Sequence, residues 1–305
     1  MATKNPEFSV VIVAYNHAKY LAAAVASVLN QTYPDFEVIV FDDGSTDNSR
    51  EIVSSIADKR VKYVYQKNSG LPACARNKAI SLSCGKYIAI LDGDDFWHEQ
   101  KLAKCRKALD TNPQVSLICH NEGIVYDNKV IRFTSCGPYS ENMYEKLLFK
   151  GNCLHTSAVV IRRDVFFRDN FIFSEKQDLY TIEDYDFWLR LSQVYRFLFL
   201  PEVLGYYRIT ETGAFLRNAE KGSLNMLNLL DSHFERFTSL NNKMRLKMKK
   251  RRSSVMSAAG RMYQHNNDFK KSREWYIRAI SEYLLNYKAI IGFLSSAVRL
   301  RIIYR

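Results

Sequence analysis

Acidic side chains form three groups along the chain, and one group follows an apolar run that is typical of a buried strand. Asp92-Gly93-Asp94 comes directly after Tyr87–Leu91, where two carboxylates separated by one glycine can turn toward a single point. Such oxygens suit Mg²⁺ or Mn²⁺, which bind through one or two carboxylates plus the phosphates of a substrate. Asp and Gly are also ordinary turn formers. The tripeptide therefore predicts either a metal site or a plain turn.

The second acidic group, Asp42-Asp43, ends the apolar run Phe36–Phe41. The residues that follow, Ser45-Thr46-Asp47, can cap a helix that begins there. Two adjacent carboxylates just before such a cap can also accept hydrogen bonds from a nucleobase N–H or a ribose hydroxyl. Tyr15, at the end of the first apolar run, either packs on such a base or belongs to the core.

The third acidic group is Glu183-Asp184-Tyr185-Asp186, which runs into the apolar segment Phe187–Leu189. A carboxylate at this turn can serve as a general base toward a hydroxyl. Helix N-termini favour Asp and Glu in any case, because the helix dipole is positive there. Both interpretations stay open from the residues alone.

Alternating elements must position these groups. Continuous Val and Ile runs predict strands covered on both faces, in an open, mostly parallel sheet with flanking helices. In such sheets the ligand crevice lies beyond the carboxyl ends of the strands, where the acidic residues fall. The predicted strand and helix pairs are Phe8–Ala14 with Tyr20–Leu29, Phe36–Phe41 with Asp47–Ile56, Val61–Tyr65 with Ala73–Leu82, and Tyr87–Leu91 with Gln100–Leu109.

The charge of the chain is concentrated at one end. Residues 241–305 hold 16 Lys and Arg against 3 Asp and Glu, a net +13, while all 305 residues carry +12. A balanced body with a basic end predicts that the end meets an anionic surface, such as phospholipid head groups or nucleic acid. No nucleic-acid recognition module accompanies the charge, so a membrane is the expected partner and nucleic acid is not.

The basic end also has an amphipathic pattern. Helical spacing from Lys288 to Arg305 puts Ile290, Leu294, Val298 and Ile302 on one stripe, with Ile291 beside it. A basic amphipathic helix of this kind can lie in a membrane interface. The alternative is a terminal helix that packs on the body and leaves its charged face in water.

The six cysteines contain no CxxC pair, and several fall in apolar segments, which indicates buried free thiols in a reducing compartment. The first apolar run, Phe8–Ala14, is short and follows Pro6-Glu7, unlike a signal peptide. No run approaches the roughly 18 apolar residues of a spanning helix. We therefore expect a cytoplasmic protein, peripheral on the inner face of the cell membrane.

Six segments, in order along the first two thirds of the chain, resemble the inverting, GT-A-fold glycosyltransferases of family 2. All three acidic groups lie within them. The segments are Ser9–Asn16, Ser27–Tyr33, Val40–Ser49, Gly70–Asn77, Leu91–Trp97 and the Glu183-Asp184 turn.

The resemblance implies an α/β chain with a GT-A, Rossmann-like sheet and a basic helical C-terminal extension. Residues 1–114 would form the nucleotide-sugar-binding half, 115–215 the acceptor-binding half of the same domain, and 216–305 the extension. The implied reaction transfers a sugar from a nucleoside diphosphate sugar, expected to be a UDP-sugar, to a hydroxyl of a glycan or lipid-linked acceptor with inversion.

The resemblance also implies roles for individual residues. Asp184 would be the base that deprotonates the acceptor. Asp94 and Asp92 would hold Mn²⁺ or Mg²⁺, with Asp92 also facing the ribose. The remaining implied residues are Tyr15, Asp42, Asp43 and Arg76 in the nucleotide pocket, with Asp43 on the base, and Glu183, His155 and Thr156 on the acceptor side.

Two departures and two rivals bear on these expectations. Many relatives place a histidine soon after the final Tyr-Arg, but this chain continues Tyr207-Arg208-Ile209-Thr210, so no histidine metal ligand is predicted. The alternative for the segment from His155 is a core strand entered by a polar turn. A nucleotidyltransferase would need a Gly-rich loop after the first strand, and Ala14-Tyr15-Asn16-His17 is not one. A non-catalytic nucleotide-sugar binder that docks through the basic end is disfavoured by the retained acidic groups.

Overall fold

The computed structural model describes residues 5–210, 219–237 and 241–300, and the chain divides into two compact units. The first, here called the sheet unit, comprises Met1–Tyr144, Cys153–Glu175 and Glu183–Glu211. The second, here called the helical unit, comprises Glu145–Asn152, Lys176–Ile182 and Thr212–Arg305.

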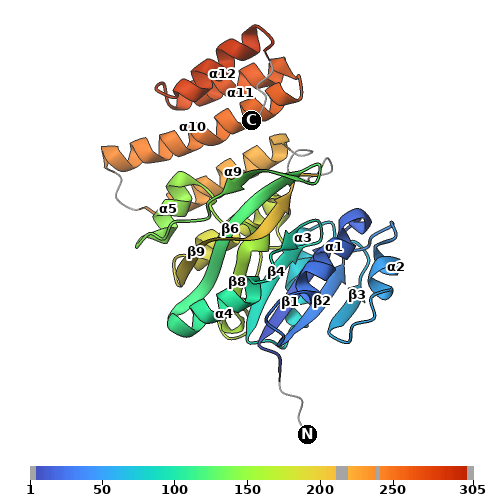
Figure 1. Cartoon of the computed structure of the whole chain (residues 1–305). Coiled ribbons are helices and arrows are strands. Elements are labelled where there is room, and N and C mark those ends of the chain that lie inside the picture. The colour runs from blue at the N-terminus through green and yellow to red at the C-terminus, as the bar shows by residue number, and fades with distance from the viewer. Residues whose placement is uncertain (1–4, 211–218, 238–240, 301–305) are drawn as a thin grey trace. The chain divides into compact units, whose positions relative to one another are not determined.

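A single sheet organises the first unit (Figure 1). Within the described residues it has nine strands in the order β3-β2-β1-β4-β8-β6-β9-β5, with β7 paired to β6. The strands are β1 (Phe8–Ala14), β2 (Phe36–Asp42), β3 (Val61–Tyr65), β4 (Tyr87–Asp92), β5 (Phe96–Trp97), β6 (Val115–Tyr126), β7 (Lys129–Thr134), β8 (Val159–Arg162) and β9 (Arg196–Arg208).

The four strands β3-β2-β1-β4 are parallel, as the βα alternation predicts. Strand β1 is buried along its whole length, which explains its unbroken run of Val and Ile. The predicted α/β sheet with flanking helices is confirmed. The later strands add antiparallel pairs, because β8 runs against both β4 and β6, and β5 runs against β9.

Helices accompany these strands through the sheet unit. Helix α1 buries Leu21, Ala24, Val25 and Val28, spaced three or four residues apart. The other helical segments are α2 (Ser49–Ser54), α3 (Pro72–Ser81), α4 (Lys101–Thr111), the 3₁₀ turn η1 (Thr156–Ala158), α6 (Arg163–Phe167) and α7 (Glu183–Leu191), with α1 itself at Ala18–Leu29. Helix α5 (Met143–Lys150) crosses the division at Tyr144.

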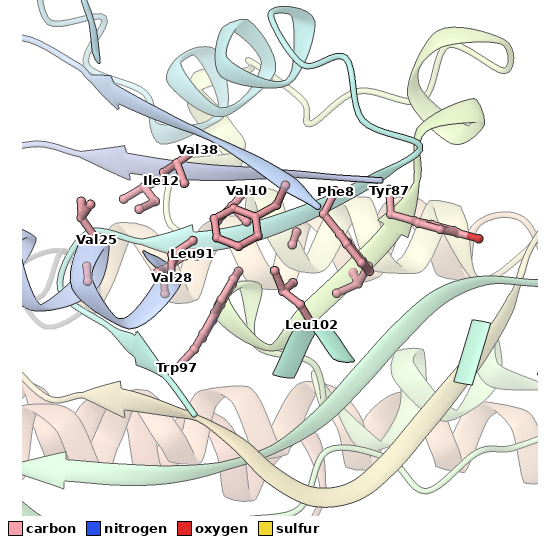
Figure 2. Close-up of a cluster of buried hydrophobic side chains, with 14 of the residues drawn as sticks. Phe8, Val10, Ile12, Val25, Val28, Val38, Tyr87, Leu91, Trp97 and Leu102 are labelled. Atoms are coloured by element: carbon pink, nitrogen blue, oxygen red, sulfur yellow. The ribbon is translucent and has the colours of Figure 1, made fainter. Parts of the chain in front are cut away.

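The core of the sheet unit lies between α1 and the central strands. Figure 2 shows Val25 and Val28 of α1 clustered with Ile12 of β1 and Leu91 of β4. Each of these side chains has an exposed fraction of zero. Burying such an aliphatic side chain contributes about 1.5–3 kcal/mol, so this cluster fixes the strand ends that carry the acidic residues.

One capping prediction was wrong. Helix α2 begins at Ser49 with Asn48 at the N-cap position, so none of Ser45, Thr46 and Asp47 is its cap residue. The Asp47 carboxylate instead accepts hydrogen bonds from the Ser49 backbone N–H and hydroxyl and from the Ala18 backbone N–H. These bonds connect the turn after β2 to the start of α1 and lower the pKa of Asp47, although burial opposes the shift.

The helical unit consists of η2 (Gln177–Leu179), α9 (Ala219–Phe234), α10 (Asn242–His265), α11 (Phe269–Glu282) and α12 (Tyr287–Ala297), with most of α5. The ring of Tyr276 packs against two glycines. A Cβ at Gly260 or Gly292 would lie 2.8 Å or 2.3 Å from that ring, so both helices need glycine to approach α11. Among the described residues, no helix is long and apolar enough to span a bilayer.

The predicted terminal helix is shorter than its sequence pattern suggested. It ends at Ala297, with Val298 as the C-cap and Arg299 in the left-handed region at φ 55°. Of the predicted stripe, Ile290 and Leu294 therefore lie on α12, with Ile291 beside them, and Val298 is its C-cap residue. Ile302 and Arg305 are outside the described residues.

Candidate active site

The carboxyl ends of β1, β2 and β4 lie at the same edge of the sheet. Register pairs Ala14 with Asp42 and Val13 with Asp92. The loops that follow are tied to the end of β1, because the Asp43 N–H donates to Ala14 O and the Gly93 N–H to Val13 O, each at 2.9 Å. The first two acidic groups of the sequence therefore flank one strand end.

Asp42 and Asp43 are both held by hydrogen bonds from this unit. Asp42 is fully buried and accepts from the Tyr63 hydroxyl at 2.6 Å and the Ser45 N–H at 2.7 Å. Burial and the Asp42 carboxylate raise the pKa of Tyr63. Asp42 thus anchors the turn after β2.

The Asp43 carboxylate is oriented by two residues that sequence reasoning missed. It accepts from the Ser69 hydroxyl at 2.8 Å, from the Ser69 N–H at 3.1 Å and from the Gln66 side-chain amide. Tyr15, on the same edge, is 48% exposed, so it is not a core tyrosine. Neither Gln66 nor Ser69 belongs to a periodic pattern, so no sequence signal marked them.

Arg76 connects two of the acidic groups. It lies on α3, is 4% exposed, and pairs at 3.3 Å with both Asp92 and Glu183. Its guanidinium lies 4.9 Å from the ring centroid of Phe173. Burial lowers the pKa of Arg76, but Asp92, Glu183 and Asp184 raise it further, so the group remains a cation. The arginine thereby holds the end of β4 next to the first turn of α7.

Glu183 lies in that ion pair and is 7% exposed. The sequence predicted an acceptor-side position for it. Its observed neighbour is Arg76, and one of its carboxylate oxygens has no hydrogen-bond partner among the described residues.

The glycine of Asp92-Gly93-Asp94 is required by close packing. A Cβ at Gly93 would lie 2.8 Å from Nδ1 of His17 and 3.0 Å from the Val13 carbonyl oxygen. Burial raises the pKa of Asp94, while the nearby His17 imidazole opposes the shift. His17 is thus a member of the site that sequence reasoning missed. Its only signal was its position just after β1.

Asp95 anchors the loop that follows β4 through two hydrogen bonds. It is 2% exposed and accepts from the Ser157 hydroxyl at 2.5 Å and the Arg208 N–H at 2.8 Å. Burial and the neighbouring Asp94 raise its pKa well above the usual range. The Arg208 guanidinium in turn lies 5.1 Å from the centroid of the Phe96 ring, so the end of β9 reaches the same edge.

Asp184 lies in the first turn of α7, and its Oδ1 accepts from the Tyr185 N–H at 2.6 Å. Burial raises its pKa, and the Glu183 charge adds to the effect, whereas Arg76 opposes it, so the pKa is about 7. A carboxylate with a pKa near neutrality can take a proton from a hydroxyl and release it again.

His155 was predicted to lie on the acceptor side, and the structure shows its polar neighbours. Its Nδ1 lies 2.5 Å from an oxygen of Glu122, a fully buried carboxylate on β6. Burial lowers the pKa of His155, but the bond and charge of Glu122 outweigh it and the Asp184 charge adds to them, which raises the pKa to about 9. Thr156 is 8% exposed and begins η1, which leads into β8. Glu122, which sequence reasoning missed, keeps His155 positively charged at neutral pH.

The residues present fit a divalent cation of the Mg²⁺ or Mn²⁺ type. Within the parts of the chain that the structure describes, no three His, Cys, Asp and Glu side chains converge on one point. Such ions need only one or two protein carboxylates when a substrate diphosphate completes the shell. Asp92 and Asp94 can supply these oxygens. Burial, with the charges of neighbouring carboxylates, raises the pKa of Asp94 and Asp95, and a bound cation would relieve this environment.

Comparison with known proteins gives this arrangement a family. The glycosyl transferase family 2 sequence family matches residues 9–168. One relative is the Escherichia coli protein named UDP-Glc:alpha-D-GlcNAc-diphosphoundecaprenol beta-1,3-glucosyltransferase WfgD. It is 32% identical over 174 residues, which cover 56% of this chain and 66% of that protein. The chain spans 32–52% of the length of the first four curated glycosyltransferases that it matches.

Two solved structures share the fold. TarS 1–349 of S. aureus, in complex with UDP-GlcNAc, has a TM-score of 0.56 at 18% identity. The match covers 98% of this chain and 93% of the TarS chain. The mannosyltransferase PcManGT of Pyrobaculum calidifontis, in complex with GDP-Man and Mn²⁺, has a TM-score of 0.58 at 17% identity. The match covers 97% of this chain and 81% of the PcManGT chain. The fold is thus that of the GT-A glycosyltransferases, and the chain belongs to glycosyl transferase family 2, a family of transferase enzymes.

Proposed function

We propose that this enzyme transfers a sugar from a nucleoside diphosphate sugar, a UDP-sugar, to a hydroxyl of a glycan or lipid-linked acceptor, with inversion at the anomeric carbon. The observation that carries the proposal is the pairing of Arg76 with both Asp92 and Glu183, because it holds the Asp92-Gly93-Asp94 loop beside the turn that carries Asp184. The names of the UDP-Glc, UDP-GlcNAc and GDP-Man proteins that resemble this chain support a nucleotide-sugar donor.

The donor side is assigned to the edge formed by β1, β2 and β4. Asp43, oriented by Gln66 and Ser69, accepts a hydrogen bond from the base, and the exposed ring of Tyr15 packs on it. Buried Asp42 supports this turn, and Asp92 faces the ribose. When bound at Asp94 and Asp92, Mn²⁺ or Mg²⁺ would neutralise charge on the departing diphosphate.

The acceptor side is assigned to Asp184 and the His155 region. As the acceptor oxygen bonds to the anomeric carbon, the bond between that carbon and the diphosphate oxygen breaks. The hydroxyl proton moves to Asp184, and the nucleoside diphosphate leaves with the electron pair. A single displacement from the opposite side inverts the centre. His155, cationic through Glu122, donates a hydrogen bond to the acceptor, and Thr156 lies next to it.

We further propose that the reaction takes place at the inner face of the cell membrane. The net +13 of residues 241–305 supports attraction to an anionic lipid surface. Attraction to the membrane would favour transfer to a lipid-linked acceptor, because the attraction brings the enzyme to the plane in which that acceptor diffuses.

A panel of nucleoside diphosphate sugars tests the proposed reaction. The full chain is incubated with each donor, a membrane lipid extract as the acceptor source, and either Mn²⁺, Mg²⁺ or EDTA, and the released nucleoside diphosphate is measured. We expect release from one donor, dependent on the metal. Tight UDP binding with no release from any donor, with or without the extract, would favour a non-catalytic binder.

A further inference from the structure

The helical unit contains a cavity of about 200 Å³ that the proposed reaction does not use. Its walls come from α10, from the turn that joins α11 to α12 and from the first residues of α12. The lining residues are Lys250, Ser254, Ser257, Arg261, Tyr283, Leu285, Asn286, Tyr287 and Lys288. All of them lie in one compact unit, so the cavity does not depend on the placement of the sheet unit.

Three of the lining side chains are cations without a carboxylate partner among the described residues. Lys250 lies with its Nζ 5.3 Å from the centroid of the Tyr283 ring, and Arg261 donates to the Ser257 hydroxyl at 3.2 Å. Neither these two nor Lys288 forms an ion pair with the part of the chain that the structure describes. A cavity with three uncompensated positive charges favours an anion.

Two neighbouring cations of α10 have carboxylate partners, unlike the three that line the cavity. Lys247 lies 3.2 Å from Glu145, and Arg252 lies 3.3 Å from Glu282 and also pairs with Asp231. The cavity thus brings together three cations that form no ion pair with the described residues and hydroxyl groups that can donate to phosphate oxygens.

Exposed apolar side chains border the cavity on the α12 side. Leu285 and Tyr287 line it and are 74% and 64% exposed. Along α12, Ile291 and Leu294 are 60% and 59% exposed, and Val298 at its C-cap is 66% exposed. The spacing of Tyr287, Ile291, Leu294 and Val298 places them along one face of the helix. Apolar surface of this extent next to a cationic cavity is typical of an interaction site rather than of a free surface.

We propose that this cavity binds the phosphate group of an anionic membrane phospholipid while the exposed face of α12 enters the interface beside it. The inference deepens, and rests on, the proposed action at a membrane surface. Charge complementarity selects the anion. The apolar border selects a lipid over nucleic acid, whose backbone would need a track of cations and exposed stacking rings instead of one local cavity.

Sedimentation of the full chain with vesicles tests the inference. We expect binding to phosphatidylcholine vesicles that contain phosphatidylglycerol and little binding to phosphatidylcholine alone. The triple variant Lys250→Gln, Arg261→Gln and Lys288→Gln should bind at least about tenfold more weakly. The matched control Lys243→Gln, Lys249→Gln and Lys270→Gln removes the same charge from exposed positions outside the cavity and should lose less than about threefold.

A second variant separates the lipid from other anions. Ile291→Ser with Leu294→Ser keeps every charge and should also weaken vesicle binding, because α12 loses its apolar contact with the interface. Equal loss in the two triple variants would reduce the site to general charge and overturn the inference. Binding of inorganic phosphate without vesicle binding, or equal binding of RNA, would overturn it as well.

The readouts distinguish this inference from the proposed reaction. Release of nucleoside diphosphate is measured with the same variants and a detergent-solubilised acceptor, and we expect wild-type rates from the Lys250, Arg261 and Lys288 triple variant. Vesicle binding without sugar transfer would count against the reaction alone. Sugar transfer with unchanged vesicle binding in the triple variant would count against the cavity alone.

Discussion

The pKa of Asp184 links a single carboxyl group to the pH dependence of the proposed reaction. Burial and Glu183 raise this pKa to about 7, so a large share of Asp184 is protonated at neutral pH in the free enzyme. A general base must be deprotonated to act, so kcat/KM should rise with pH through about 7. The neighbouring Glu183 charge is one of the causes and can be removed without touching Asp184.

We therefore predict that Glu183→Gln moves the acid limb of the kcat/KM profile to lower pH. The substitution removes a negative charge that raises the pKa of Asp184 and frees Arg76 to interact with it, and both effects lower that pKa. The profile is measured with saturating metal between about pH 5 and 9. Asp186→Asn is a matched control, because Asp186 lies in the same turn but pairs with Arg190 at 2.8 Å. A limb that stays in place or moves upward would contradict the account.

The pair of His155 and Glu122 predicts a pH-dependent contribution to stability. The pKa of His155 rises from 6.5 to about 9 on folding, so the folded protein binds the proton more tightly than the unfolded chain does. This contribution is fully present below pH 6.5 and is lost as the pH rises through about 9.

His155→Gln should accordingly lower Tm most near pH 6.5 and least near pH 10. Thermal unfolding of the wild type and the variant at pH 6.5, 8 and 10 measures the difference. A difference that remains constant or grows toward pH 10 would show that Glu122 does not hold the proton on His155 in the folded chain.

At the scale of elements, the loop after β4 depends on the closeness of the residues that follow β1. Gly93→Ala would push a methyl group toward Nδ1 of His17 at 2.8 Å and the backbone oxygen of Val13 at 3.0 Å. The backbone oxygen cannot rotate away, so Asp92 and Asp94 must shift. We predict a turnover loss of about 100-fold or more, since displacement of reacting groups by about 1 Å has such effects.

The control for Gly93→Ala is a substitution near the same loop that introduces no clash with the residues after β1. Phe96→Leu preserves an apolar side chain in β5 and should retain most turnover. Far-ultraviolet circular dichroism and Tm show whether each variant folds. Wild-type turnover in a folded Gly93→Ala protein would mean that the position of Asp92 and Asp94 is not critical.

The parallel part of the sheet could be predicted from the sequence, and the rest could not. The bounds of β1 and β3 agree with the prediction because both strands are short apolar runs between polar turns. The antiparallel strands β8 and β5 carry no signal for direction in their composition. At α2, Asn48 takes the N-cap position, and the Asp47 carboxylate before it links two helices, because it accepts from the Ser49 N–H at the start of α2 and from the Ala18 N–H at the start of α1.

At the candidate site, acidic residues at strand ends were visible in the sequence, whereas their partners were not. Arg76 and Glu183 are 107 residues apart and His155 and Glu122 are 33 apart, so only the folded chain brings each pair together. His17 follows β1 without belonging to any motif that carries chemistry by itself. The spacing of apolar residues predicts faces and ends of elements, but it does not predict which polar side chains meet across them.

At the scale of the whole molecule, charge and chemistry are carried by different parts of the chain. The acidic groups lie in the sheet unit, and the net +13 lies in residues 241–305. Some described cations of the helical unit form ion pairs, whereas the three that line the cavity do not. The chain spans only 32–52% of the length of the first four curated relatives, so donor, acceptor and linkage are properties to be measured on it directly.

The central claim is that the donor binds at the edge formed by β1, β2 and β4 and that Asp184, in the first turn of α7, is the base. Its most direct test compares turnover with donor binding in Asp184→Asn. The nucleoside diphosphate released with acceptor and metal is compared with the Kd for the donor, measured by calorimetry on the same preparation. We predict that turnover falls by about 10²–10⁴, the usual contribution of a general base, while Kd stays within about twofold. Unchanged turnover would remove Asp184 as the base and contradict the assignment of this edge as the active site.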